Sequence, residues 1–187
     1  TRPGRLPHSP RHESHPLPKI GLLSDSHGRA STTRRGVAAL LDHGADVLIH
    51  LGDVGTVEVI DALCVDHPDT GAQVPAHLVF GNTDWDLGAL TEYAHDLDVN
   101  VDHPVGRLPV DGGELVFCHG HEPEPMRRAL DNGVRYLCHG HTHRDTDERR
   151  GGTRVINPGA LFRAKVYSVA LLDTQHDRLD FHEVAAS

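Results

Sequence analysis

The sequence of 187 residues is poor in several residue types, and each scarcity excludes a class of protein. It contains one Trp, three Tyr, four Phe and one Met, so a core must be built mainly from aliphatic side chains. No apolar run approaches the roughly 20 residues of a membrane-spanning helix. With 37% hydrophobic residues the composition supports one compact domain, and it excludes collagen-like, coiled-coil and transmembrane classes.

Cysteine is also scarce. Cys64, Cys118 and Cys138 are an odd number, and the sequence contains no C-x-x-C pair. This pattern excludes a disulfide framework and favours a reducing compartment. The start of the sequence shows no apolar segment followed by a cleavage site, so we predict a cytoplasmic location and no membrane association.

Basic residues are outnumbered by acidic ones. The sequence has 18 Lys and Arg against 27 Asp and Glu, which gives a net charge of −9. Proteins that bind a nucleic-acid backbone carry an excess of Lys and Arg, so extended nucleic-acid binding is not expected. If the substrate is a phosphate ester, bound metal must offset the acidic charge of the protein locally.

Histidine, in contrast, is abundant, with 17 residues. Three of them, His8, His12 and His15, lie within residues 1–18, which also hold five of the twelve prolines. Such a segment has too little apolar surface to offset the entropy of ordering it. We therefore predict a flexible Pro-rich tail at 1–18 and a folded domain at 19–187.

The first half of the predicted domain alternates short apolar strands with helices. Strands are predicted at 20–25, 46–53 and 76–84, and helices at 31–44 and 57–64. Ser31 is the expected N-cap of the first helix, and Gly44 its C-terminal stop. This alternation is typical of βαβ units, so it predicts an α/β fold with a mostly parallel sheet.

The second half has a more antiparallel pattern. The turn Asp111-Gly112-Gly113 predicts a hairpin over 105–119, and Pro123 and Pro125 favour the start of a helix at 124–132. Further short strands are predicted near 135–138, 154–157, 166–172 and 178–184.

Side chains able to bind metal follow five of these strands. They occur as Asp25-Ser26-His27, Gly52-Asp53, Gly81-Asn82-Thr83-Asp84, Cys118-His119-Gly120-His121 and Gly140-His141-Thr142-His143. Each motif alone is weak, because a Gly-Asp pair is usually a plain turn and a lone His is often a surface residue. Ligands of open α/β sheets bind beyond the carboxyl ends of the strands. The joint position of the five motifs therefore predicts a metal site at one edge.

The donor types narrow the choice of metal. Two Asp, one Asn and four His form an oxygen and nitrogen set without cysteine, which favours Mn²⁺, Zn²⁺, Fe or Ni²⁺ over a thiolate-bound structural zinc. Seven ligands exceed the four of a structural zinc and suit two divalent transition-metal ions that share one carboxylate. Such a pair generates a hydroxide nucleophile and holds a phosphoryl group for in-line attack.

These ordered motifs, followed by Asn157-Pro158-Gly159, resemble the calcineurin-like metallophosphoesterase superfamily. Over 19–184 the chain is similar to the small bacterial and archaeal phosphodiesterases of the YfcE and MJ0936 type. The resemblance implies an αββα sandwich with a dinuclear site, for which we expect Mn²⁺ first, at the carboxyl edge of the strands. It also implies the ligand roles: Asp25, His27 and His143 for one metal, Asn82, His119 and His141 for the other, and Asp53 as the bridge.

Two positions depart from the family pattern. Many members have His after the motif Asn, where it acts as an acid near the leaving group, but this chain has Thr83. A diester or a more acidic leaving group is therefore expected. Asp84 is predicted to act beside Asn82 by orienting it or a water. Ala160 replaces the Ser that usually follows Asn-Pro-Gly.

Other residues near the motifs have structural interpretations. His50 is expected to pack or to support the ligands, and strand alternation is expected to point His139 away from them. Cys118 and Cys138 are expected to be small buried residues rather than zinc ligands. His121 is left open between a contact to phosphate and a structural role.

Trp85 is expected either to line the pocket or to cover the core. Arg127, Arg128 and Arg144 are expected to be solvated charges, with a contact to substrate phosphate as the alternative.

We therefore predict a hydrolase, most specifically a phosphodiesterase, in which a hydroxide activated by two metals attacks phosphorus and Asn82 stabilises the developing charge. One alternative is a phosphomonoesterase or nucleotide phosphatase. Another is a non-catalytic scaffold of the same fold, like a retromer subunit that has lost part of its metal set. Pairing through an exposed edge strand to form a homo-oligomer is left open.

Overall fold

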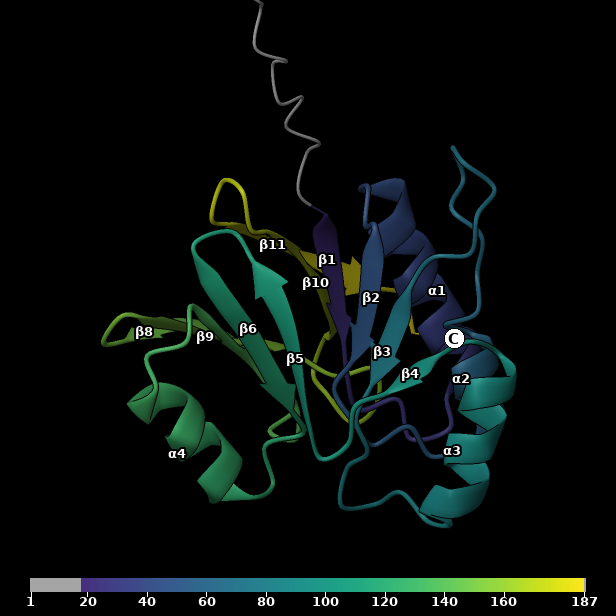
Figure 1. The fold of residues 1–187 in the computed structure, drawn as a ribbon. Helices are drawn as coiled ribbons and strands as arrows, with labels where there is room; N and C mark the ends of the chain where they lie inside the picture. Colours follow the sequence, from purple (N-terminus) through teal and green to yellow (C-terminus); the bar gives the residue numbers. More distant parts are fainter. Residues whose placement is uncertain (1–17, 187) are drawn as a thin grey trace, which may run out of the picture.

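The computed structural model describes residues 18–186, which form two β-sheets with helices on their outer sides (Figure 1). The predicted tail lies outside these residues apart from Pro18. In chain order the elements are β1 (Lys19–Leu23), α1 (Ala30–Asp42), β2 (Val47–His50), α2 (Val57–Asp61), β3 (Ala76–Leu78), α3 (Leu87–Asp96), β4 (Asn100–Val101), β5 (Val105–Val110), β6 (Gly113–Cys118), α4 (Pro123–Asp131), β7 (Tyr136–Cys138), β8 (Asp145–Arg150), β9 (Thr153–Pro158), β10 (Tyr167–Asp173) and β11 (Arg178–Val184).

The first sheet has six strands in the order β11-β10-β1-β2-β3-β4. β1, β2, β3 and β4 are parallel, so their carboxyl ends lie at one edge. β10 pairs antiparallel with β1, and β11 pairs antiparallel with β10. β1 is buried along almost its whole length, which explains its continuous apolar sequence, since both faces of a central parallel strand are covered.

The second sheet has five strands in the order β5-β6-β7-β9-β8. β6, β7 and β9 are parallel, and β5 and β8 run antiparallel at its two edges. The predicted hairpin is confirmed as the β5–β6 pair, in which Val110 lies opposite Gly113.

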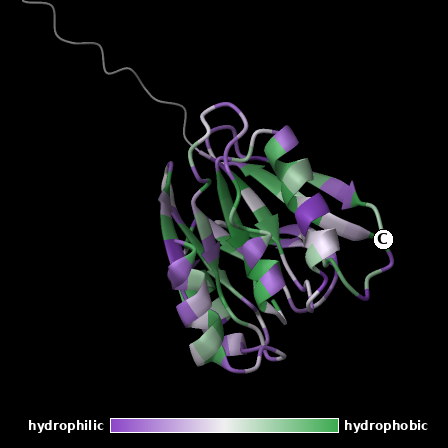
Figure 2. Cartoon of the chain, turned by 90° about the vertical axis from the view of Figure 1, so that its right-hand side faces the viewer, coloured by the Kyte–Doolittle hydropathy of each residue, from purple (hydrophilic) through white to green (hydrophobic). Residues whose placement is uncertain are grey.

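Three apolar clusters hold the layers together. Leu22 and Phe117 belong to the cluster that joins the two sheets. Leu40 belongs to the cluster that joins α1, α2 and α3 to the first sheet, and Ala129 of α4 to the cluster on the second sheet. Figure 2 shows hydrophobic residues concentrated in the strands and hydrophilic residues on loops and outer helix surfaces. The predicted αββα sandwich is therefore confirmed.

The start of α1 differs from the prediction. The helix begins at Ala30, its N-cap is Arg29, and Ser31 lies within the first turn, so the predicted cap is wrong. The reason is the tight turn after β1, in which the Arg29 N–H donates to the Ser26 carbonyl at 2.8 Å and starts the helix earlier. The predicted stop is confirmed, because Gly44 follows the helix with a φ of 87°.

The sequence pattern also missed α3, β4 and β8 and overextended β3. The Asp86 side chain caps α3 by accepting the Ala89 N–H at 3.3 Å. β8 is a polar, mostly exposed edge strand without apolar alternation. β3 ends at Leu78, which leaves 81–84 as a loop. Among the described residues, no helix is long and apolar enough to cross a bilayer.

Candidate metal centre

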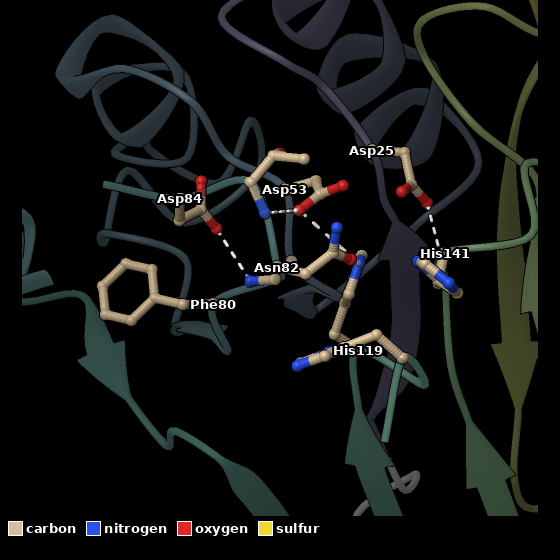
Figure 3. A network of polar contacts seen from close by, with 12 residues as sticks. Asp25, Asp53, Phe80, Asn82, Asp84, His119 and His141 are labelled. Carbon is tan, nitrogen blue, oxygen red and sulfur yellow. Dashed lines mark hydrogen bonds and ion pairs between the residues drawn. The ribbon is translucent and has the colours of Figure 1, made fainter. Parts of the chain in front are cut away.

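Five loops from both sheets meet beyond the carboxyl ends of their strands (Figure 3). They follow β1, β2 and β3 of the first sheet and β6 and β7 of the second, and they carry all seven predicted ligands. Backbone hydrogen bonds tie the loops together: the Asp25 N–H donates to the Gly52 carbonyl, and the Gly140 N–H to the His119 carbonyl, each at 3.0 Å. The predicted common edge is therefore present.

Asp25, His27, Asp53 and His143 form one group of donors. One ligand atom of each lies within 4.8 Å of the ligand atoms of the others. His27 Nε2 is 3.4 Å from both Asp53 Oδ2 and His143 Nε2, and His143 Nε2 is 3.2 Å from Asp25 Oδ1. Ligand atoms with bonds of about 2.1 Å to one ion lie roughly 3–4 Å apart, so these four converge as metal ligands do.

Asn82, His119 and His141 form a second group. His119 Nε2 is 3.2 Å from Asn82 Oδ1, and the ring centroids of His119 and His141 are 5.1 Å apart. The backbone N–H of His141 donates to Asp25 Oδ2 at 3.0 Å, which places this second group directly beside the first (Figure 3).

The carboxylate of Asp53 lies between the two groups. Its Oδ2 faces His27, while its Oδ1 lies 3.5 Å from His119 Nε2 and accepts the Thr83 N–H at 3.0 Å. Burial alone would raise the pKa of Asp53, but hydrogen bonds with His119 and Thr83 lower it below its usual value. Asp53 is therefore ionised. One of its carboxylate oxygens faces the first group of donors, and the other faces the second.

The carboxylate of Asp25 tests whether these donors fit metal. Its Oδ1 is buried and lacks a hydrogen-bond partner among the described residues, and its contact to His143 lacks hydrogen-bond geometry. Burial raises the pKa of Asp25. An unpartnered buried carboxylate oxygen destabilises a fold unless a cation lies beside it. The oxygen and nitrogen donors therefore fit divalent transition-metal ions.

The family profile described as "Calcineurin-like phosphoesterase superfamily domain" matches residues 19–177 of this chain. The chain belongs to the calcineurin-like phosphoesterase superfamily. The predicted family is therefore confirmed.

One curated protein and two solved structures resemble the chain over nearly their whole length. "Phosphodiesterase MJ0936" of Methanocaldococcus jannaschii is 26% identical over 161 residues, which cover 84% of this chain and 93% of that protein. The structure of a novel archaeal phosphodiesterase matches with a TM-score of 0.77 at 24% identity, over 88% of this chain and 99% of that one. The E. coli phosphoesterase YfcE matches with a TM-score of 0.61 at 23% identity, over 89% and 100%.

Five of the seven predicted ligands of this calcineurin-like phosphoesterase adopt left-handed backbone conformations. Their φ angles are 55° at Asp25, 44° at His27, 55° at Asp53, 67° at His141 and 57° at His143. Such conformations cost a non-glycine residue about 1 kcal/mol or more, and they concentrate at functional sites where the surroundings fix them. Here they turn the ligand side chains sharply off their strands.

Glycines allow the loops to approach the ligands closely. A Cβ at Gly81 would collide with Oδ1 of Asp53, and a Cβ at Gly140 would collide with Oγ of Ser24. Because Gly81 has no unusual φ, its requirement is purely steric. The two glycines explain why the motifs need a residue without a side chain beside each ligand.

Hydrogen bonds orient the imidazole ligands. His119 Nδ1 lies 2.7 Å from the Leu51 carbonyl oxygen, so it carries the proton and directs Nε2 toward Asp53. His27 Nδ1 lies 3.4 Å from Thr83 Oγ1, which leaves Nε2 of His27 facing the donor group. The supporting position of Thr83 is not visible in the sequence, because it depends on how two distant loops meet.

His50 supports the loop after β1, which carries Asp25 and His27. It is fully buried, its Nε2 lies 2.8 Å from Ser26 Oγ, and its Nδ1 accepts the Gly52 N–H at 3.3 Å. Burial lowers the pKa of His50 to about 3, so this imidazole is neutral. The predicted supporting role of His50 agrees with these contacts.

Asn157 fixes the loop that carries His141 and His143. Its Nδ2 donates to the Gly140 carbonyl at 2.8 Å and to Thr142 Oγ1 at 3.0 Å, and its Oδ1 accepts the Gly159 N–H at 2.9 Å. The Asn157-Pro158-Gly159 motif marked this position in the sequence, but its local pattern gives no sign of the partner loop. His139 is buried beside Asn157 and lies outside the donor groups.

Asp84 contacts the backbone rather than the other donors. Its Oδ1 accepts the Gly55 N–H at 2.7 Å, and its Oδ2 accepts the Gly81 N–H at 2.8 Å. Asp84 thereby connects the loop after β2 to the loop after β3, which carries Asn82 and Thr83 (Figure 3).

The remaining residues singled out in the sequence lie outside the two groups. His121 lies near His119, with ring centroids 5.3 Å apart and the ring planes tilted by 50°. Cys118 and Cys138 are buried free thiols, and the group of described residues that could hold a metal ion contains no cysteine. Trp85 is 82% exposed, so the prediction that it covers the core is wrong.

Arg127 and Arg128 pair with Glu124 on the exposed surface of α4, as solvated helix charges do. The side chain at Ala160 is fully buried, so that position faces the protein interior.

Proposed function

We propose that this chain is a metal-dependent phosphodiesterase that hydrolyses a small phosphate ester. The Asp53 carboxylate carries the proposal, because its two oxygens face two separate groups of donors. Superfamily membership and the phosphodiesterase named among its relatives support the same reaction class.

We assign Asp25, His27 and His143 to one metal ion, Asn82, His119 and His141 to the other, and Asp53 to both. When bound, two divalent ions supply Lewis acidity and generate hydroxide at neutral pH. We propose Mn²⁺, while the same oxygen and nitrogen donors also suit Zn²⁺, Fe and Ni²⁺.

We propose that Asn82 acts on the substrate directly. Its amide oxygen faces His119 Nε2, so its NH₂ group is the donor available to a phosphoryl oxygen. A donor already in position stabilises the charge that develops on that oxygen in the transition state. The backbone contacts of Asp84 support a role in positioning Asn82, the first of the two roles predicted for Asp84.

Thr83 sets the leaving-group preference that we propose. Its hydroxyl lies against His27, and no imidazole stands at this position to protonate a departing alkoxide. Esters with acidic leaving groups, which depart without protonation, are therefore the expected substrates. The net charge of −9 disfavours extended nucleic acid and is compatible with a small ester.

The test is hydrolysis of bis(p-nitrophenyl) phosphate and p-nitrophenyl phosphate by the full chain with Mn²⁺. We expect faster turnover of the diester, and a loss of about a thousandfold in Asp53→Asn and in His141→Ala. Asp98→Asn is the matched control, because Asp98 is exposed and has a left-handed φ of 55°, like Asp53.

Other outcomes favour the alternatives. Faster hydrolysis of the monoester indicates a phosphomonoesterase or nucleotide phosphatase. Absence of turnover with Mn²⁺, Zn²⁺, Fe²⁺ and Ni²⁺ indicates a scaffold, against which the complete set of seven ligands argues. Full activity of Asp53→Asn would overturn the proposed site.

The three free cysteines support a cytoplasmic location as part of the proposal.

A further inference from the structure

Phe162 places two arginines beside the candidate metal centre. Its ring centroid is 5.3 Å from the ring centroid of His27. The guanidinium carbon of Arg29 lies 4.6 Å from the Phe162 centroid, and that of Arg163 lies 5.1 Å from it. Two cations therefore gather on one ring that directly contacts a proposed metal ligand.

The backbone fixes both arginines close to Asp25. The Arg29 N–H donates to the Ser26 carbonyl at 2.8 Å, and the N–H of Leu161, just before Phe162, donates to the Ser24 carbonyl at 3.2 Å. Arg163 has a left-handed φ of 50°, the same strained conformation that the ligands adopt. The loop that presents Arg163 is therefore attached to the loop that presents the first ligands.

Within residues 18–186, no carboxylate pairs with either of these arginines. Arg29 and Arg163 are exposed and form no ion pair there, whereas eight of the eleven other arginines of this range do. A cation–π contact at an exposed site is weak, and like charges on one ring repel each other. In a chain of net charge −9, such a pair is best explained by an anion that it binds.

We propose that Arg29 and Arg163, held together on Phe162, bind a second, non-reacting phosphate of the substrate. This rests on the proposed phosphodiesterase activity and names its substrate class: diesters that carry an additional phosphate group. Guanidinium groups bind phosphate through paired, charge-assisted hydrogen bonds, and the position beside His27 puts this subsite next to the reacting phosphorus.

Two matched substrates test this subsite. They are the p-nitrophenyl ester of thymidine 5′-phosphate and the same ester with a 3′-phosphate, and release of p-nitrophenol reports cleavage of the diester only. We expect wild-type KM to be about tenfold lower for the 3′-phosphorylated ester. In Arg29→Gln and in Arg163→Gln the KM ratio of the two esters falls toward one, and added NaCl lowers the wild-type ratio.

Arg178→Gln is the control for loss of one positive charge. Arg178 lies opposite Asp173 in the sheet, and Asp173 lies opposite Lys19 at the start of β1, so Arg178 is at the end of the sheet remote from the site. This variant keeps the wild-type ratio. Equal KM values for the two esters in the wild type, or an unchanged ratio in both arginine variants, would overturn the subsite.

Calorimetric binding of thymidine 3′,5′-bisphosphate separates the subsite from the reaction. If no ester is hydrolysed but binding weakens about tenfold in both arginine variants, the proposed function fails and the subsite stands. If the esters are hydrolysed and binding is the same in all variants, the subsite fails and the proposed function stands.

Discussion

Oγ1 of Thr83 lies 3.4 Å from Nδ1 of His27. The contact joins the loop after β3 to the loop after β1, and it leaves Nε2 of His27 directed at Asp53 and His143. Thr83 thus supports a proposed ligand at the position where the family pattern led us to expect a histidine. A partner that fixes the orientation of a ligating imidazole typically changes metal affinity by 10–100-fold.

Thr83→Val is therefore expected to weaken Mn²⁺ binding about tenfold, at the low end of this range because the contact is long. Thr83→Ser retains the hydroxyl and the affinity. Isothermal titration of the metal-depleted chain measures both, with Thr70→Val in an exposed loop as the control. Wild-type affinity in Thr83→Val would show that the hydroxyl does not orient His27.

Gly81→Ala is expected to remove metal from the site. The new Cβ would collide with Asp53 Oδ1, so the loop that carries Asn82 must move away. Elemental analysis should fall from about two ions per chain to one or fewer. Gly152→Ala is the matched control, because its Cβ meets nothing within 4 Å and its φ is also outside the left-handed region. Equal metal content in the two variants contradicts the assignment of Asp53.

Asp25→Asn should change stability in opposite directions with and without metal. Asp25 is buried and one of its oxygens has no partner among the described residues, so in chelator the charge destabilises the fold. We expect the variant to melt at or above the wild-type temperature in EDTA and below it in saturating Mn²⁺, where the wild type gains binding free energy. A variant that melts lower by the same amount in both buffers rules out this explanation.

Asp177 provides a pH-dependent part of the stability away from the metal centre. Its Oδ1 accepts hydrogen bonds from Tyr136 Oη and Arg154 Nη1, each at 2.9 Å, and Arg149 pairs with its Oδ2. Burial alone would raise the pKa of Asp177, but these hydrogen bonds outweigh it and lower the pKa. Because the pKa of Asp177 is lower in the folded state, the ionised carboxylate stabilises the fold at every pH above its unfolded-state pKa of about 4. This stabilisation is lost as the pH falls through the folded-state pKa.

Asp177→Asn is therefore expected to lose about 1–2 kcal/mol of unfolding free energy at pH 7. The difference from the wild type should shrink as the pH falls below the unfolded value of about 4 and through the lowered folded-state pKa of Asp177. Urea unfolding in EDTA measures this difference in unfolding free energy without a contribution from metal binding. Asp98→Asn, at an exposed left-handed position, serves as the control. A difference that stays constant with pH would assign the effect to packing.

The positions of the proposed ligands were predictable because each follows an abrupt change from apolar to polar sequence. β1, β2 and β6 end in buried residues, and Asp25, Asp53 and His119 come within three residues of those ends. Because parallel strands place their carboxyl ends at one edge, the local signal was enough to bring these residues together.

The supporting contacts could not be predicted in this way. Thr83 with His27, Asp84 with Gly55 and Asn157 with Gly140 each join two loops whose relative position depends on the packing of the whole domain. The left-handed backbone at Asp53 is also unmarked in the sequence, since glycine is the usual signal for that conformation.

The fold was predictable where burial imposes a pattern. The central strands and the β5–β6 hairpin have such patterns, whereas β8, with the sequence DTDERR, is held by its pairing to β9 and has no apolar alternation of its own. α3 buries only Leu90 and Ala94, too few apolar positions to reveal a helix by periodicity.

Both proposed ion positions draw ligands from both sheets. Asp25, His27 and Asp53 follow strands of the first sheet and meet His143 from the second, while Asn82 from the first meets His119 and His141 from the second. Each ion would therefore act as a non-covalent crosslink between the two halves of the sandwich. A change that separates the sheets at this edge would therefore disrupt both proposed ion positions at once, with every proposed ligand residue still intact.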